Sequence, residues 1–335
     1  MKRKFKIMGI ILFSILLLWV FFAVIPPDKV IEDNPFIIKP GERPLVAAHR
    51  GGKNLNPENT FKAFDDAVFN YGIDILELDL CLTKDQKLVA IHDLWINECS
   101  DVEEVTGSKE KYLIREHTLD ELREFNFGAK FMNKAGQMPY NNLVEKEQAD
   151  RKDVIKTNKL AIATIDEIFE AYKDTKLMFI VEIKDEGEAG LIAADILNSL
   201  ITENLKNYKL NKRVVIGTFH TEIEKYLKEK YSNLMRGGSV GEVTKFVLTQ
   251  MFGVNIFDNS SFSCLQIPVK KKAFGVEFNL AKKTYVKRAH RRNISVQYWT
   301  INDKEEMRRL IELGADVIMT DNPDMLVELL EEMGM

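Results

Sequence analysis

Residues 45–52 read LVAAHRGG, an apolar run that ends in a histidine, an arginine and two glycines. Three later stretches share this arrangement: ILELDL at 75–80, LVAIHD at 88–93 and MFIVEIK at 178–184. Each is a short apolar run of the kind that forms a buried strand, and each carries charged or imidazole side chains near its end. Because the carboxyl ends of parallel strands meet on one rim of a barrel, the sequence predicts that these side chains converge.

Apolar runs alternate with amphipathic stretches from Pro44 to Gly334, which predicts an α/β fold with parallel strands joined by helices. The polar segment 94–160 fits this alternation poorly, and we interpret it as a small insertion after the third strand. The rest of 44–334 has about the length of one (β/α)8 TIM barrel. The expected strands are Leu45–His49, Ile75–Leu80, Leu88–His92, Leu177–Ile183, Val214–Thr218, Leu234–Arg236, Ala273–Phe278, Val296–Thr300 and Val317–Thr320.

Residues 7–25 (IMGIILFSILLLWVFFAVI) contain no charge, and a helix of this length matches the hydrocarbon core of a bilayer. Residues 1–6 hold four cations and no acid, so we expect them in the cytoplasm and the rest outside, in a single-pass cell-membrane protein. The alternative, a cleaved signal peptide, would have a shorter apolar region followed by small residues. Residues 26–43 are expected to be a linker, and 44–334 the barrel domain, with its insertion at about 94–160.

Composition limits the partners of this chain. Its 47 Lys and Arg against 51 Asp and Glu give a net charge of -4, which argues against nucleic-acid binding. Three cysteines without metal-ligand spacing exclude a disulfide framework and a zinc site. Basic residues crowd around His290, which is typical of an outer helix with a solvated basic face; contact with anionic lipid or a polyanionic envelope polymer is the alternative.

Three carboxylates near the strand ends predict a metal site. Glu77 and Asp79 are two residues apart and therefore share a face, and Glu182 ends the fourth run. Together they would form a net negative, all-oxygen site for a hard cation such as Mg2+ or Ca2+. For any single pair of charges, a salt-bridged core is the simpler interpretation. Four such ends on one rim favour a site instead.

The remaining polar groups predict chemistry at phosphorus. His49 and His92 can supply a base and an acid, and Arg50 and Lys184 offer fixed positive charge to an anionic substrate. The residues alone therefore predict metal-assisted cleavage of a phosphate ester.

Seven short motifs, in this order and spacing, resemble the glycerophosphodiester phosphodiesterase family. They are HRG at 49–51, PENT at 57–60, ELD at 77–79, HD at 92–93, EIK at 182–184, WTIN at 299–302 and GADVIMTDNP at 314–323. Residues 234–278 match the family pattern least, so the sequence says little about the pocket wall there.

The resemblance implies a (β/α)8 barrel that hydrolyses glycerophosphodiesters to sn-glycerol 3-phosphate and an alcohol, with one divalent cation as cofactor. Phospholipase-D-like cleavage of lysophospholipids and a non-catalytic tethered barrel are the alternatives. The implied roles are metal ligands for Glu77, Asp79 and Glu182, an acid/base pair for His49 and His92, and phosphate contacts for Arg50 and Lys184. Glu58 would be a metal neighbour or orient Arg50, and Trp299 would line the pocket unless it is barrel packing.

Overall fold

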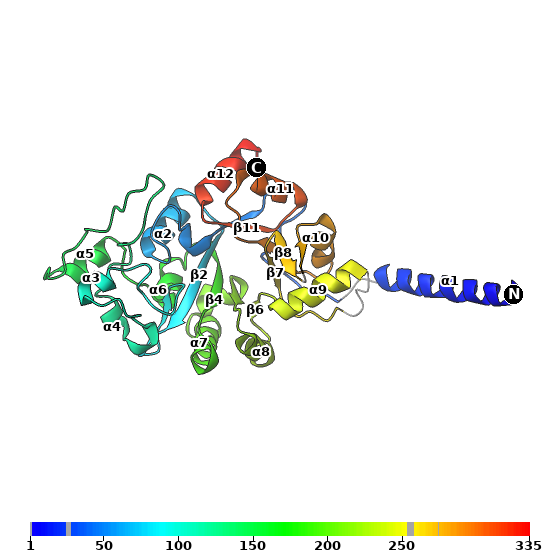
Figure 1. Ribbon diagram of the computed structural model, residues 1–335, viewed down its shortest axis with the longest axis horizontal. Helices are drawn as coiled ribbons and strands as arrows, with labels where there is room; N and C mark the ends of the chain where they lie inside the picture. Colours follow the sequence, from blue (N-terminus) through cyan, green and yellow to red (C-terminus); the bar gives the residue numbers. More distant parts are fainter. Residues whose placement is uncertain (1, 25–27, 253–257, 274) are drawn as a thin grey trace.

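A closed parallel barrel forms the body of the molecule (Figure 1). The computed structural model describes residues 2–24, 28–252, 258–273 and 275–335. Within them, eight parallel strands follow the order β6-β5-β4-β2-β1-β11-β10-β7, and a parallel bridge between Gly237 and Cys264 joins the two ends. This confirms the predicted TIM barrel. The strands are β1 (Leu45–Ala48), β2 (Ile75–Leu82), β4 (Met178–Ile183), β5 (Val214–Gly217), β6 (Met235–Arg236), β7 (Cys264–Ile267), β10 (Ser295–Tyr298) and β11 (Val317–Thr320).

Helices surround the barrel and bury its outward-facing side chains. Two of the helix starts follow from local sequence: the Thr164 and Glu167 side chains form a reciprocal capping box, and Pro323 opens the last helix. The outer helices are α2 (Phe61–Asp65), α6 (Ile165–Ala171), α7 (Gly187–Ser199), α8 (Thr221–Lys230), α9 (Val240–Phe252), α10 (Lys283–His290), α11 (Lys304–Leu313) and α12 (Pro323–Glu332).

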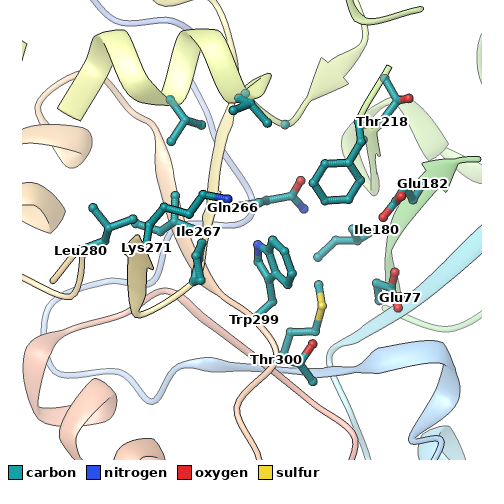
Figure 2. A pocket seen from close by; sticks show the side chains of 18 of the residues that line it. Glu77, Ile180, Glu182, Thr218, Gln266, Ile267, Lys271, Leu280, Trp299 and Thr300 are labelled. Carbon is teal, nitrogen blue, oxygen red and sulfur yellow. The ribbon is translucent and has the colours of Figure 1, made fainter. Parts of the chain in front are cut away.

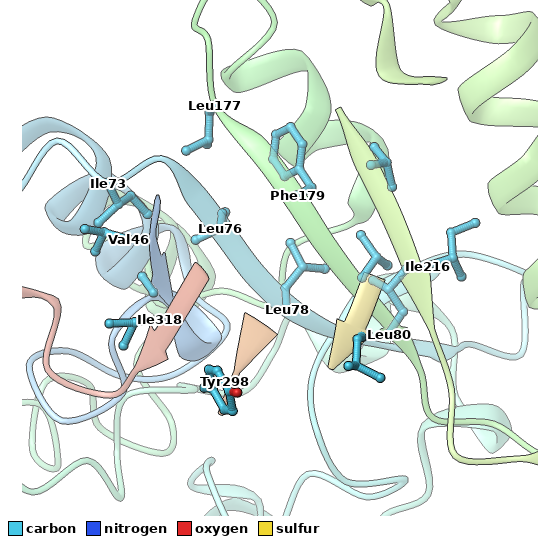
Figure 3. Packing of buried hydrophobic residues seen from close by; sticks show 14 of the residues in the cluster. Val46, Ile73, Leu76, Leu78, Leu80, Leu177, Phe179, Ile216, Tyr298 and Ile318 are labelled. Carbon is cyan, nitrogen blue, oxygen red and sulfur yellow. The ribbon is translucent and has the colours of Figure 1, made fainter. Parts of the chain in front are cut away.

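Alternation along the strands separates the core from the site. In β2, the side chains of Leu76, Leu78 and Leu80 are fully buried and belong to the main core between barrel and helices (Figure 3). Since neighbouring strand residues face opposite sides, Glu77 and Asp79 point into the barrel. The apolar–acidic alternation of ILELDL therefore builds the core and the site together.

Two predicted strands differ from the structure. Leu88–His92 contains β3 (Leu88–Ala90), which pairs antiparallel with β2 and is not one of the parallel barrel strands. Predicted strand Ala273–Phe278 includes Phe274, which lies outside the described residues, and the rest falls in a hairpin of β8 (Lys270–Ala273) and β9 (Val276–Asn279). The parallel strand in this region is β7, which the sequence did not reveal.

The polar segment between β3 and α6 forms a lobe of its own beside the barrel. It holds three short helices: α3 (Val102–Thr106), α4 (Leu119–Leu122) and α5 (Arg151–Thr157). A second apolar cluster, which includes Ile96, Leu122 and Phe127, lies under them. In the sequence, β3 and this lobe lie between β2 and β4, although β2 and β4 pair directly as parallel neighbours in the barrel.

The predicted linker packs against the barrel from Asp28 onward. The Val30 backbone N–H donates to the Arg292 carbonyl at 2.9 Å, and the Asn34 side chain donates to the Ser263 and Asn293 carbonyls, both at 2.8 Å. Phe36 is fully buried and closes the barrel interior from the end where the strands begin. It packs in a cluster, here called the barrel floor, of Phe36, Ala47, Ile75, Ile180, Val215, Met235, Cys264, Val317 and Met319.

The N-terminal helix α1 (Lys2–Val24) projects away from the barrel (Figure 1). The stretch Arg3–Phe21 has a mean hydropathy of 2.1 and is not buried by the rest of the protein. By length and composition it can cross a membrane, a test that a signal sequence also passes. Met1 and residues 25–27, where the predicted anchor ends and the linker begins, lie outside the described residues.

Candidate active site

A cavity of about 470 Å³ opens at the carboxyl ends of the barrel strands. Eight of the nine predicted site residues line it; Glu58, the ninth, lies behind Arg50. Figure 2 shows Trp299 between the carboxylates of Glu77 and Glu182 on one side and Lys271 and Leu280 on the other. The cavity thus has an acidic end on β2 and β4 and another end on the β8–β9 hairpin.

The three predicted metal ligands come together at the acidic end. Glu77, Asp79 and Glu182 each offer a carboxylate oxygen, and these oxygens lie within 4.8 Å of one another. Burial raises the pKa of Glu77 to about 8, although the charge of His49 lowers it. A dication bound beside a carboxylate would favour its ionised form and lower this pKa again. An all-oxygen, net negative set of this size fits a hard divalent cation.

His49 is held in place from both sides. Its Nδ1 lies 2.5 Å from Asp321 Oδ1, and its Nε2 faces Glu77 Oε2 at 3.9 Å. Burial lowers the pKa of His49, but the charges of Glu77 and Asp321 outweigh burial, so the net pKa is raised above its ordinary value. Because Nδ1 is engaged by Asp321, Nε2 is the nitrogen that faces the cavity.

Arg50 is enclosed by carboxylates. Its Nη1 donates to Glu58 Oε1 at 3.1 Å, its Nε lies 3.1 Å from Asp79 Oδ2, and its backbone N–H donates to Glu77 Oε2 at 2.8 Å. The turn that follows requires glycine, because at Gly51 a Cβ atom would lie 2.8 Å from the Phe64 ring and φ is +81°. The geometry agrees with the second predicted role of Glu58, orienting Arg50.

Lys184 is the second cation that contacts the carboxylate cluster. Its Nζ donates to Glu182 Oε1 at 2.7 Å and lies 3.6 Å from Asp79 Oδ1. Burial lowers the pKa of Lys184, but the two carboxylates raise it by more than burial lowers it. The net pKa is above the ordinary value, so the ammonium group stays charged. His92 lines the same cavity, is partly exposed, and its Nδ1 lies 2.8 Å from Asp93 Oδ1.

Sequence reasoning missed two groups that support the site. Asp321 contacts His49, and the Asn302 side chain donates to Asp321 Oδ2 at 2.7 Å. Both residues lie within family-like motifs, Asn302 in WTIN at 299–302 and Asp321 in GADVIMTDNP at 314–323. The position of Asp321 could have revealed it: Asp321 directly follows β11, just as His49 directly follows β1, so both lie on the same rim.

The end of the cavity away from the carboxylates is mostly apolar. Trp299 packs edge-to-face against Phe219 at a ring-centroid distance of 6.1 Å. Helix α9 and the β8–β9 hairpin supply most of the remaining wall. The apolar residues that line this end include Phe219, Val240, Val243, Val247, Leu248, Ile267, Pro268, Phe278, Leu280 and Trp299.

Comparison with known proteins assigns this arrangement to a family. The family model described as "Glycerophosphoryl diester phosphodiesterase family" matches residues 49–325. The chain belongs to this family. As a member of it, the chain is a phosphoric diester hydrolase.

Relatives and solved structures agree with this assignment. The chain is 26% identical over 294 residues to a glycerophosphodiester phosphodiesterase from Caldanaerobacter subterraneus subsp. tengcongensis, which covers 87% of this chain and 99% of the relative. It is also 26% identical to a lysophospholipase D from Rattus norvegicus, over 85% of this chain and 86% of the relative. A phosphodiesterase from Oleispira antarctica, solved with its product sn-glycerol-3-phosphate, has the same fold, with a TM-score of 0.59 at 18% identity, covering 86% of this chain and 97% of that one.

Proposed function

We propose that this chain is a metal-dependent phosphodiesterase that hydrolyses glycerophosphodiesters to sn-glycerol 3-phosphate and an alcohol. The observation that carries the proposal is the meeting of two histidines, two cations and three carboxylates in one cavity. Arg50 and Lys184 balance two of the three carboxylates, and a divalent cation would favour the ionised form of Glu77 against the effect of burial on its pKa. The non-catalytic alternative gains no support, since each of the two histidines and three carboxylates that the chemistry needs lines the cavity.

In this proposal Glu77, Asp79 and Glu182 hold one divalent cation, Mg2+ or Ca2+. When bound, the cation would withdraw electron density from the phosphate and stabilise the negative charge that builds on its oxygens. Arg50 and Lys184 hold the phosphate through their fixed charges, and Glu58 keeps the Arg50 guanidinium in place.

His49 and His92 exchange the protons. One takes the proton of the attacking hydroxyl, which by resemblance to the family is the neighbouring glycerol hydroxyl, and the other protonates the leaving oxygen. Water then opens the cyclic phosphate with the two roles reversed. Trp299, midway along the cavity, would separate the phosphate from the remainder of the substrate (Figure 2).

We further propose that α1 is an uncleaved anchor with the barrel outside the cell membrane. The supporting features are the length and hydropathy of Arg3–Phe21 and the four cations in residues 1–6. The substrate would then be supplied on the extracytoplasmic side.

The test is turnover of glycerophosphocholine by the full chain in detergent. We expect release of sn-glycerol 3-phosphate to stop on addition of EDTA and to return with Mg2+ or Ca2+. A Glu182→Gln variant should need a higher cation concentration for half-maximal turnover, because one of three anionic ligands is lost. Turnover that persists in EDTA would contradict the proposed metal dependence. Absence of turnover with every cation tested would contradict the proposal that glycerophosphodiesters are the substrates.

The apolar half of the cavity favours a second substrate class, lysophospholipids. Phe219, Val247 and Phe278 offer surface that a hydrocarbon chain can cover, whereas the glycerophosphate part needs only the acidic end. A Val247→Asn variant should lose turnover of lysophosphatidylcholine while keeping turnover of glycerophosphocholine. An equal effect on both substrates would exclude an acyl-chain role for this wall.

A further inference from the structure

Positive charge is concentrated in one short part of the chain. Residues 265–293 contain nine Lys and Arg and one acidic residue, a net of +8, while all other residues hold 38 cations and 50 acids, a net of -12. This part forms most of β7, the β8–β9 hairpin, α10 and the turn after it. Seven of the cations are exposed, and we refer to them as the basic face: Lys270, Lys271, Lys272, Lys282, Lys283, Lys287 and Arg291.

The basic face has few acidic neighbours within the described residues. On α10, Lys283 and Lys287 are four positions apart and therefore share one side of the helix. Glu277 of the hairpin, which pairs with Lys270 at 3.1 Å, is the one acidic residue in the sequence 265–293. From the packed side, Asp316 meets His290 at 2.8 Å, and Asp258 meets the buried Arg292 at 2.8 Å. Both acids point inward, so they do not neutralise the outer surface.

The segment that follows α1 is hydrogen-bonded to the end of α10, next to the basic face. Arg292 follows α10 closely, and its Nε donates to the Asp28 carbonyl at 3.2 Å, while the Asn293 side chain donates to the Ile31 carbonyl at 2.9 Å. Four residue steps separate Val24, the last residue of α1, from Asp28. A fully extended chain of that length spans at most about 14 Å. The end of α10 is therefore tied close to the point where α1 ends.

The overall arrangement agrees with this tie. Figure 1 shows α9, α10 and the β8 strand at the end of the molecule from which α1 projects, and α3, α4 and α5 at the opposite end. If α1 crosses a bilayer, the basic face is among the parts of the barrel nearest to the lipid surface. Lysines near an anionic membrane each add attraction, provided that they lie within a Debye length of it.

We infer that the basic face is a docking surface for an anionic lipid bilayer, and that it holds the barrel against the membrane in one orientation. This inference rests on the proposed role of α1 as an anchor, and it is independent of the proposed chemistry. Lys271 and Phe278 belong both to the hairpin and to the cavity wall. Docking would therefore bring the apolar end of the cavity close to the lipid.

The test uses the full chain in nanodiscs of phosphatidylcholine, with or without phosphatidylglycerol. A fluorophore is attached at Thr284→Cys on α10, in a background where Cys99 is replaced by Ser, since Cys81 and Cys264 are buried. Lipid-borne quenchers report contact. We expect stronger quenching in the anionic discs, and Lys283→Glu/Lys287→Glu should shift the equilibrium away from contact by about fivefold or more per lysine.

A matched control reverses two exposed lysines of the opposite lobe, Lys109→Glu/Lys146→Glu, and should leave quenching unchanged. Equal quenching in both kinds of disc would overturn the inference, as would quenching that survives Lys283→Glu/Lys287→Glu, because contact would then follow from the tether alone. If the basic face binds an added polyanionic polymer but shows no preference for anionic discs, the inference would be overturned and the polymer would be the partner. Glycerophosphocholine turnover, measured on the same discs, reports the proposed function separately.

Discussion

At the scale of single residues, the site follows from where polar side chains interrupt apolar strands. His49, Glu77 and Glu182 could be assigned to one rim because each ends or interrupts an apolar run. Asp321 obeys the same rule, but it meets His49 across 272 positions of sequence. A strand-end position predicts the rim on which a residue lies, but not its contacts there, and so the support of His49 became visible only in the structure.

His49→Ala and His92→Ala should each lower turnover of glycerophosphocholine by about 10²- to 10⁴-fold, the usual contribution of a general acid or base. His117→Ala is the control, since His117 stacks on Tyr112 at a centroid distance of 3.6 Å in the lobe between β3 and α6 and should keep wild-type turnover. Thermal unfolding of each variant checks that the barrel remains folded. Near wild-type turnover in either of the first two variants would refute the acid/base assignment.

Asp185 gives a pH-dependent test of stability. Burial raises its pKa to about 6, although its Oδ2 accepts the Leu82 N–H at 2.7 Å. An acid with a raised pKa binds its proton more tightly in the folded state, so it destabilises the fold progressively as pH rises from about 4 to above 6. The free energy of unfolding of Asp185→Asn, measured by denaturant titration, should therefore exceed that of wild type by about 1–2 kcal/mol at pH 7.5. At pH 4 the variant should show no such gain. An equal gain at both pH values would show that ionisation is not the cause.

At the scale of elements, strands were recognised where several apolar residues stand together. The four-residue strand β7 contains Cys264 and the polar Gln266, whose side-chain amide donates to Gln297 Oε1 on the neighbouring strand β10 at 3.1 Å. An inward polar residue weakens the apolar pattern of β7, so the sequence predicts a barrel strand at the hairpin arm near Val276 instead. The same limit applies to Phe36, which opens the run FIIK at 36–39, because three apolar residues are too few to predict burial.

Phe36→Ala should destabilise the barrel by about 3–5 kcal/mol, the usual cost of deleting a buried aromatic side chain. The ring is fully buried in the barrel floor, so its removal would leave a cavity there. Phe219→Ala is the matched control, because that ring is 58% exposed at the cavity mouth. Denaturant midpoints of the two variants in detergent give the comparison. A Phe36 variant as stable as the Phe219 variant would mean that the segment before β1 does not seal the floor.

At the scale of the whole molecule, the segment before β1 joins two functions. It fixes the floor through Phe36, and through Asp28 and Ile31 it fixes the barrel to the end of α1. Composition and hydropathy predicted a helix that can cross a membrane followed by a barrel. They did not predict that the connection between them is packed, because its hydrogen bonds reach residues near position 292, far along the chain.

Removal of residues 1–25 should give a soluble barrel that hydrolyses glycerophosphocholine at the rate of the full chain, because the cavity takes no residue from α1. Removal of residues 1–43 should instead give a barrel of clearly lower thermal stability, since it also deletes Phe36 and the hydrogen bonds of Val30 and Asn34. Thermal unfolding and turnover of both truncations, measured side by side, separate tethering from folding. A shorter truncation that is folded but inactive would give the anchor a part in catalysis, and a longer one as stable as the shorter would contradict the packed connection.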